Sequence, residues 1–314
     1  MWVRPVIWMM CFLSPPHLKS EFFVRKEAVT LLQGNDSLSV LDRIVSTKIH
    51  DMPDLSRRDA IFCDFNGRIC DIASIYTISG SILISSSDSE KESTRRKLVD
   101  GTSWDEECDV LVADSAIFRI SIFPSNYGEF FEIFDVNLED SSADRLIEKE
   151  DHLFVKYESS HRIRIDALVK FENLEKIISL LRDSKFIEMN HERWDKFRIL
   201  LGIREICDAM GNLPDEMGLG DLISNDKGCY PGQEVHARLE SRGRKIKSLC
   251  RLTGDIPLFP GKHKNPKFGS VSITSAAFLE GQAIALALIR IGDDNPEEIL
   301  FEGNKYSIEI MGYP

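Results

Sequence analysis

The densest set of side chains that could do chemistry lies in one short segment of this 314-residue chain. It reads Lys227-Gly228-Cys229-Tyr230-Pro231-Gly232-Gln233-Glu234. Flanking glycines let the backbone turn tightly and approach a ligand, and nearby basic side chains favour the thiolate, the reactive form of cysteine. We therefore predict that Cys229 is a nucleophile, a metal-handling ligand or a redox-responsive thiol. The alternative is a buried structural cysteine, which behaves as a small apolar residue.

The neighbours of Cys229 have binding and structural interpretations. Tyr230 either stacks on an aromatic ligand or fills the core. Gln233 and Glu234 offer acceptors that bind a ligand or cap the next segment. Lys227 contacts an anionic group or stays solvated.

This eight-residue pattern resembles the signature of the YgfZ family of folate-binding proteins, which is related to the aminomethyltransferase, or T-protein, of the glycine cleavage system. The flanks resemble the family too. The stretch RILLGIRE, with Arg198, is similar to the mitochondrial iron–sulfur assembly branch, and Arg238 with Gly243 fits the family's A-R-x-x-x-x-G continuation. NGRICDI, which ends just past Asp71, resembles the first hairpin. The similarity extends roughly from Phe22 to Gly312.

The resemblance implies a T-protein-like α+β fold that binds tetrahydrofolate or a derivative in a central cavity. The binding residues that it implies are Lys227, Gly228, Tyr230, Gly232, Gln233, Glu234, Arg238 and Arg198. Chemistry is assigned to Cys229 and to Asp71, which falls near the aspartate that T-proteins use beside the folate nitrogen. The alternative for Asp71 is an ordinary half-exposed carboxylate on a strand.

The family likeness implies an accessory role in the assembly or repair of iron–sulfur clusters, which would support iron–sulfur enzymes such as tRNA-modifying ones. The expected partners are folate and iron–sulfur proteins or assembly factors. The first alternative is a tetrahydrofolate-dependent aminomethyl- or methyltransferase, against which Leu200 counts because it replaces the usual pterin-binding glutamate. The second alternative is a module that senses folate without using the thiol.

The elements that must position these residues follow from local patterns. Asn66-Gly67 and Ser79-Gly80 separate β-rich runs, so three antiparallel strands are predicted between about Ala60 and Ser86, with a type I′ turn at Asn66-Gly67. A second hairpin is predicted from 153–157 and 162–168. Apolar spacing predicts helices in several ranges, namely 37–47, 174–181 and 194–201.

The domain organisation follows from a change of character after Arg244. From there, short β-type runs alternate with Gly and Pro turns, which predicts a small C-terminal β-barrel. The expected units are an N-terminal extension at 1–21, a folate-binding T-protein-like region at 22–240 and the barrel at 241–314. The short apolar run near the N-terminus superficially resembles a signal peptide, and we favour a loosely attached extension.

Composition excludes several classes of protein. A net charge of −12 argues against a stable nucleic acid complex, since coating phosphates requires a basic face. The basic tract from His236 to Arg251 is interpreted as a solvated connector in preference to an RNA contact. Seven cysteines without a C-x-x-C pair indicate a reducing, cytoplasmic setting, and we predict no metal site. No segment reaches transmembrane length.

Overall fold

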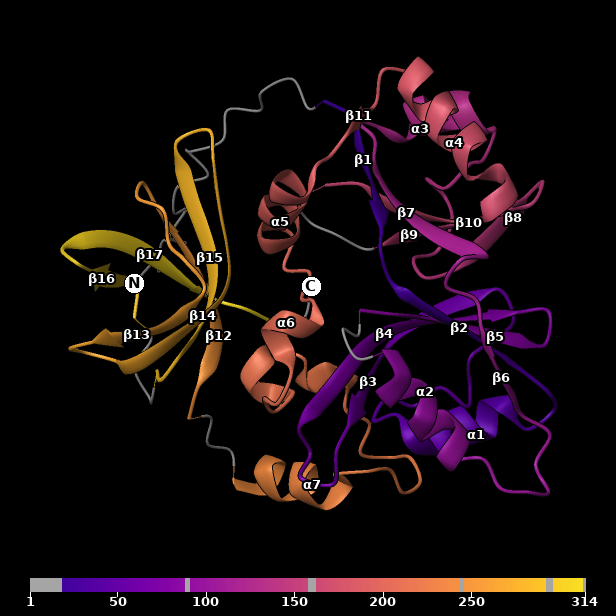
Figure 1. The fold of residues 1–314 in the computed structure, drawn as a ribbon, viewed down its shortest axis with the longest axis horizontal. Coiled ribbons are helices and arrows are strands. Elements are labelled where there is room, and N and C mark those ends of the chain that lie inside the picture. The colour runs from indigo at the N-terminus through magenta and orange to yellow at the C-terminus, as the bar shows by residue number, and fades with distance from the viewer. Residues whose placement is uncertain (1–18, 88–90, 158–161, 243–245, 292–295, 313–314) are drawn as a thin grey trace, which may run out of the picture.

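The computed structural model describes residues 19–87, 91–157, 162–242, 246–291 and 296–312. Within these ranges the chain forms three β-sheets with helices packed on and between them, so the predicted α+β class is confirmed (Figure 1). Nearly all of the expected N-terminal extension, residues 1–18, lies outside the described residues.

The first sheet holds the strands that the glycine turns predicted. Its five strands have the order β3-β4-β5-β2-β6. Their bounds are β2 (Ala28–Gln33), β3 (Ser56–Cys63), β4 (Ile69–Ile78), β5 (Ser81–Ser86) and β6 (Asp109–Val112). Helices α1 (Ser37–Ile44) and α2 (Lys91–Asp100) lie against one face, where Leu41, Phe62 and Ile75 share an apolar core.

The type I′ turn of this sheet lies at Ser79-Gly80 and not at Asn66-Gly67. Ser79 and Gly80 both have positive φ, 49° and 81°, and join the Ile78–Ser81 pair, which is the type I′ arrangement. The prediction of that turn at Asn66-Gly67 is wrong. Only Gly67 has positive φ there, and Asp64 closes a longer loop by accepting hydrogen bonds from Asn66 N and Arg68 N, at 2.9 and 2.8 Å.

The second sheet has the order β11-β1-β7-β10-β9-β8. Its strands are β1 (Glu21–Arg25), β7 (Ile117–Phe123), β8 (Leu146–Lys149), β9 (His152–Tyr157), β10 (Arg164–Lys170) and β11 (Ile187–Glu188). The antiparallel β9–β10 pair confirms the second predicted hairpin. Helices α3 (Tyr127–Phe134) and α4 (Phe171–Asp183) contribute to the core on one face. Helix α3 was not expected; Asn126 caps it by accepting from Glu129 N.

The first and second sheets are joined directly, because only Lys26 and Glu27 separate β1 from β2. An apolar layer with Tyr76, Leu83 and Val155 packs between them. Charged side chains at the end of β1 are therefore held where the two sheets meet.

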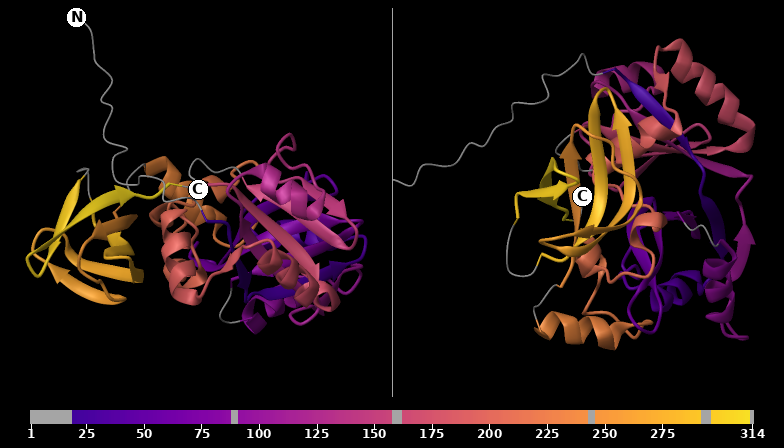
Figure 2. Two further views of the ribbon diagram at one scale, coloured as in Figure 1. Left: turned by 90° about the horizontal axis from the view of Figure 1, so that it is seen from above. Right: turned by 60° about the vertical axis from the view of Figure 1, so that its left-hand side comes forward.

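The third sheet has the order β13-β14-β15-β12-β17-β16. Its strands are β12 (Ser248–Gly254), β13 (Gly261–Asn265), β14 (Gly269–Leu279), β15 (Gln282–Ile289), β16 (Glu298–Phe301) and β17 (Asn304–Ile310). The expected barrel is a curled half-barrel sheet (Figure 2). Its edge strands approach each other, since Asn265 Nδ2 donates to Leu300 O at 2.8 Å.

The segment between the second and third sheets connects all parts of the molecule. It contains α5 (His191–Leu200), α6 (Ile206–Ala209), two 3-10 turns at Asp215–Met217 and Gly220–Leu222, and α7 (Gln233–Arg242). Apolar residues of β3 and β4, of α5 and α6, and of the third sheet form one core here, with Ile61, Ile206 and Ile284 as examples. No helix of the described residues is long and apolar enough to cross a membrane.

Candidate functional site

The segment around Cys229 is fixed by glycines that pack against the loop between β3 and β4. Gly232 has φ +86°, and a Cβ placed there would lie 2.5 Å from Gly67 Cα. One turn later, His236 Nε2 contacts Gly67 O at 2.9 Å. Helix α7 therefore starts beside this loop, as Figure 1 shows. Only glycine satisfies both the left-handed backbone and the close approach at position 232.

Lys227 anchors the segment to the end of α1. Its Nζ donates to Val45 O and Thr47 O at 2.8 and 2.9 Å, and also to Asp42 O. The side chain is almost fully buried, and burial lowers the pKa of Lys227 although Asp42 opposes this. Because the three carbonyls use its donors, Lys227 is committed to the fold in this structure and is not presented to a ligand.

Tyr230 points inward beneath the thiol. It is buried, its hydroxyl lies 3.4 Å from His236 Nδ1, and its ring centroid lies 5.5 Å from Lys227 Nζ. Since Gly67 O can only accept, His236 carries its proton on Nε2 and accepts from Tyr230 through Nδ1. Burial raises the pKa of Tyr230 to about 12, so it stays a neutral donor. The interpretation of Tyr230 as a core residue fits this placement.

Cys229 is exposed, which rules out the buried structural alternative. Gly228, Glu234 and Arg238 are exposed as well, and Gln233 Nε2 lies 3.5 Å from Lys227 O. In contrast, burial raises the pKa of Cys63 and of Cys250 to about 12, so these thiols are poor nucleophiles. The signature thus presents an accessible thiol on a rigidly held loop.

Asp71 lies on the face of the first sheet that packs against α1 and α2. It pairs with Phe62, a residue of that core, and its Oδ2 accepts from Thr94 Oγ1 at 3.0 Å and from Ser86 Oγ. Asp71 is fully buried, which overturns the alternative of a half-exposed strand carboxylate. The implied position beside a folate does not match this placement, because ligand space is found on the other face of the sheet.

Arg198 is also internal. It donates to Asp208 Oδ2 at 2.7 Å and to Ser275 Oγ at 2.6 Å, and pairs with Asp195 at 2.7 Å. These contacts join α5, α6 and β14, so Arg198 holds elements together. In the basic tract, His236 is buried and Arg251 bonds Leu200 O and Glu309, so neither is a solvated connector residue.

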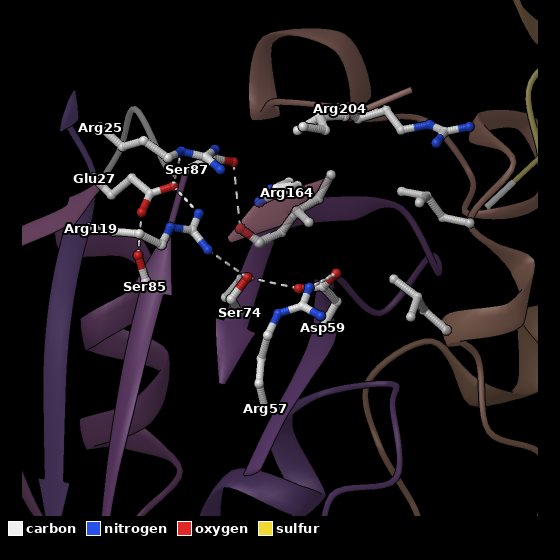
Figure 3. A pocket seen from close by; sticks show the side chains of 15 residues that line it. Arg25, Glu27, Arg57, Asp59, Ser74, Ser85, Ser87, Arg119, Arg164 and Arg204 are labelled. Carbon is white, nitrogen blue, oxygen red and sulfur yellow. Dashed lines mark hydrogen bonds and ion pairs between the residues drawn. The ribbon is translucent and has the colours of Figure 1, made fainter. Parts of the chain in front are cut away.

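A central cavity lies where the first and second sheets meet the segment that follows α5. The cavity has a volume of about 60 Å³ and opens to solvent. Its wall is rich in arginines and hydroxyls, as Figure 3 shows. The lining residues are Arg25, Glu27, Arg57, Asp59, Ile72, Ala73, Ser74, Ser85, Ser87, Arg119, Arg164, Ile203, Arg204, Leu219 and Leu222. None of the residues predicted as a site from the sequence is among them.

The polar wall of the cavity has a signal of its own in the sequence. Around the cavity, arginine precedes a carboxylate by two positions at Arg25–Glu27, Arg57–Asp59 and 164–166. In an extended strand, residues i and i+2 lie on the same face, so each repeat places an ion pair together. Charges on the inner face of a strand, where apolar residues are expected, mark the cavity wall.

Arg119 is the centre of this network. Its Nη1 donates to Ser74 Oγ at 2.8 Å and to Tyr76 OH at 3.0 Å, while its Nη2 pairs with Glu27. Burial alone would raise the pKa of Glu27, but Arg119 and then Arg25 outweigh it and the pKa is lowered. The carboxylate therefore stays ionised in the interior.

Two further arginines enclose an aromatic ring. The guanidinium carbons of Arg57 and Arg164 lie 3.8 and 3.7 Å from the ring centroid of Tyr157. Arg57 pairs with Asp59, and Arg164 Nη2 pairs with Asp166 at 3.0 Å. The Tyr157 hydroxyl is buried without a hydrogen-bond partner among the described residues. Stacking and ion pairs together fix the positions of both guanidinium groups.

Known proteins resemble this chain in sequence over part of its length and in structure over most of it. No family model matches the chain. A tRNA-modifying protein YgfZ of Photobacterium profundum is 32% identical over 108 residues, which are 31% of this chain and 33% of that protein. The Escherichia coli protein of the same name is 29% identical over 139 residues, 40% and 42% of the two chains. A putative chloroplastic transferase of Arabidopsis thaliana is 39% identical over 79 residues, 24% and 18% of the two chains.

The similarity in sequence thus spans less than half the length of these relatives, whereas the similarity in structure is nearly complete. The glycine cleavage aminomethyltransferase T of Bartonella henselae matches with a TM-score of 0.78 at 11% identity, over 95% of this chain and 87% of that one. The fold is therefore that of the aminomethyltransferases. In sequence, the chain is similar over part of its length to the proteins named YgfZ, which agrees with the resemblance seen in the segment around Cys229.

Proposed function

We propose that this protein binds a folate and supports tRNA modification as an accessory factor. Two of the relatives reported above are named tRNA-modifying proteins. In this proposal its finer role is to assist the assembly or repair of iron–sulfur clusters that tRNA-modifying enzymes use. Its partners would then be iron–sulfur proteins or their assembly factors.

The observation that carries the folate part is the central cavity in an aminomethyltransferase fold. Polar side chains of both signs line it, and it opens to solvent. Carboxylates of Glu27 and Asp59 supply acceptors, and arginines supply donors, so the wall suits a ligand that carries both amino groups and carboxylates. The residues present therefore fit a folate.

The proposal separates ligand binding from thiol chemistry. Folates carry one-carbon groups on their ring nitrogens. The cavity residues hold and orient the ligand and restrict water, while the exposed Cys229 lies outside the cavity lining and reacts with, or coordinates, a group that a partner brings. A single protein thiolate does not hold a cluster alone, so any cluster would be shared or transient.

The folate half is tested by calorimetric titration of the purified protein with tetrahydrofolate, in parallel on wild type and Cys229→Ala. We expect both to bind, because Cys229 is not part of the cavity. No binding by wild type would overturn the folate half of the proposal.

The thiol half is tested by complementation of a bacterial strain that lacks its YgfZ protein. We expect Cys229→Ala to abolish rescue, measured as restored thiolated tRNA modification. Cys207→Ala, at another exposed thiol, is the matched control and should rescue fully. Full rescue by Cys229→Ala would instead indicate a folate-sensing module that does not use the thiol.

A second candidate is a tetrahydrofolate-dependent aminomethyl- or methyltransferase, which the fold itself favours. Leu200 counts against it, because this side chain packs on an apolar core and adds no carboxylate. Arginines pair with Glu27 and Asp59 and lower the pKa of both carboxyl groups, so these carboxylates can accept hydrogen bonds but are weak proton acceptors. Tetrahydrofolate-dependent release of ammonia from an aminomethyl donor would establish this reaction.

A further inference from the structure

In two arginines of the cavity, protein side chains contact one part of the guanidinium group and leave the other part without a partner among the described residues. Arg25 Nε pairs with Glu27 at 2.9 Å, and its guanidinium carbon lies 5.1 Å from the Trp194 ring centroid. Arg164 is held in the same way, by Asp166 and by the Tyr157 ring. Each guanidinium thus has one carboxylate and one aromatic face that fix its position.

The remaining donors of these arginines have no partner in the described parts of the chain. The hydrogen bonds of Arg164 use Nε and Nη2, which leaves Nη1, while Arg25 has only its Nε contact. Near the cavity, the fully buried guanidinium nitrogens without a partner in the described residues are Arg57 Nε and Arg119 Nε. The free nitrogens of Arg25 and Arg164 are not in this group, so they keep some exposed surface. Since Arg25 and Arg164 both line the cavity, their free donors face space that a ligand can enter.

The charges around Arg25 and Arg164 favour the binding of an anion. The side chain of Arg25 is only 6% exposed, and burial together with Arg119 lowers its pKa, with a smaller contribution from Arg164. Guanidinium groups with unused N–H donors in a poorly solvated site are costly, and a charge-assisted pair with an oxyanion offsets that cost. The fork of N–H groups on arginine matches the two oxygens of a carboxylate or the oxygens of a phosphate.

We propose that Arg25 and Arg164 together bind an anionic oxygen group of the cavity ligand, and that this group is a carboxylate of the glutamyl part of folate. The assignment to folate rests on the proposed function. It also fixes an orientation, because it places the glutamyl end of the ligand against the β1–β10 side of the cavity.

The experiment compares a ligand with and without the glutamyl group. Wild type should bind tetrahydrofolate about 10- to 100-fold more tightly than tetrahydropteroate, the range expected for hydrogen bonds to a charged group. Arg25→Gln should bind the two ligands equally, because the amide keeps polarity and loses the charge. Arg95→Gln is the matched control: it removes a mostly buried arginine with one carboxylate partner, Asp114, outside the cavity lining, and should behave as wild type.

Equal affinity of wild type for both ligands would overturn the assignment, and this comparison does not depend on whether a variant folds. Glu27 keeps Arg119 and Ser85 as partners in Arg25→Gln, so that variant is expected to fold. If wild type binds neither pterin ligand, the proposed function fails, and the anion site is tested separately by thermal unfolding with p-aminobenzoylglutamate and with inorganic phosphate. A rise in Tm with phosphate in wild type but not in Arg25→Gln would support the site with a different ligand. No rise with either probe would overturn it.

Discussion

At the scale of single residues, Gly232 has the most stringent requirement in the signature. It combines φ +86° with a contact that leaves no room for a Cβ beside Gly67. We expect Gly232→Ala to lower the free energy of unfolding by about 1–3 kcal/mol, because strain and a displaced loop add. Gly228→Ala is the matched control, since a Cβ there meets nothing within 4 Å. Urea unfolding measures both; equal stability of the two variants would contradict the tight packing.

A second prediction at this scale concerns the unpaired hydroxyl of Tyr157. Tyr157→Phe keeps the ring between Arg57 and Arg164 and removes a buried polar atom without a partner. We expect stability to be unchanged or higher by up to about 1 kcal/mol. Tyr76→Phe, which removes an acceptor 3.0 Å from Arg119 Nη1, should instead destabilise by about 1–3 kcal/mol. Chemical denaturation distinguishes them, and a clear loss of stability in Tyr157→Phe would reveal a partner for the hydroxyl.

At the scale of elements, the ion pairs between the first two sheets predict the response to acid. The pKa values of Glu27, Asp59 and Asp166 are lowered. Burial alone would raise them, but the nearby arginines have the larger effect. The native state therefore binds fewer protons than the unfolded state. This stabilisation is fully present above the ordinary values of 4.5 and 3.8, and is lost as the pH falls through the lowered values. Glu27→Gln should flatten this part of the stability profile against pH, and an unchanged slope would contradict the assignment.

The elements also show how far the sequence predicts this fold and its site. Glycine turns located the β3–β4–β5 hairpins, because glycine marks backbone positions that other residues avoid. The segment around Cys229 was found because its residues are contiguous. The cavity was missed because its charged residues come from strands scattered from Arg25 to Arg164, and only the folded sheets bring them together. The face of Asp71 depends on its pairing with Phe62, which spacing alone does not specify.

At the scale of the whole molecule, one apolar core joins the first sheet to the third through α5 and α6. Ile284 of β15 belongs to this shared core, whereas Ile273 of β14 belongs to a core within the third sheet. Both are buried, so replacing either by alanine should cost about 2–5 kcal/mol locally. The shared core implies that the first and third sheets do not unfold independently.

Hydrogen exchange distinguishes the two variants. Because Ile284 shares its core with Ile61 and Cys63, we expect Ile284→Ala to speed amide exchange in β3 as well as in β15. Ile273→Ala, the matched control, should act mainly on the third sheet, with a smaller effect on β3. If β3 exchanges at the wild-type rate in Ile284→Ala while β15 is accelerated, the third sheet is energetically independent, and the connection through α5 and α6 does not couple it to the sheet that forms the cavity wall.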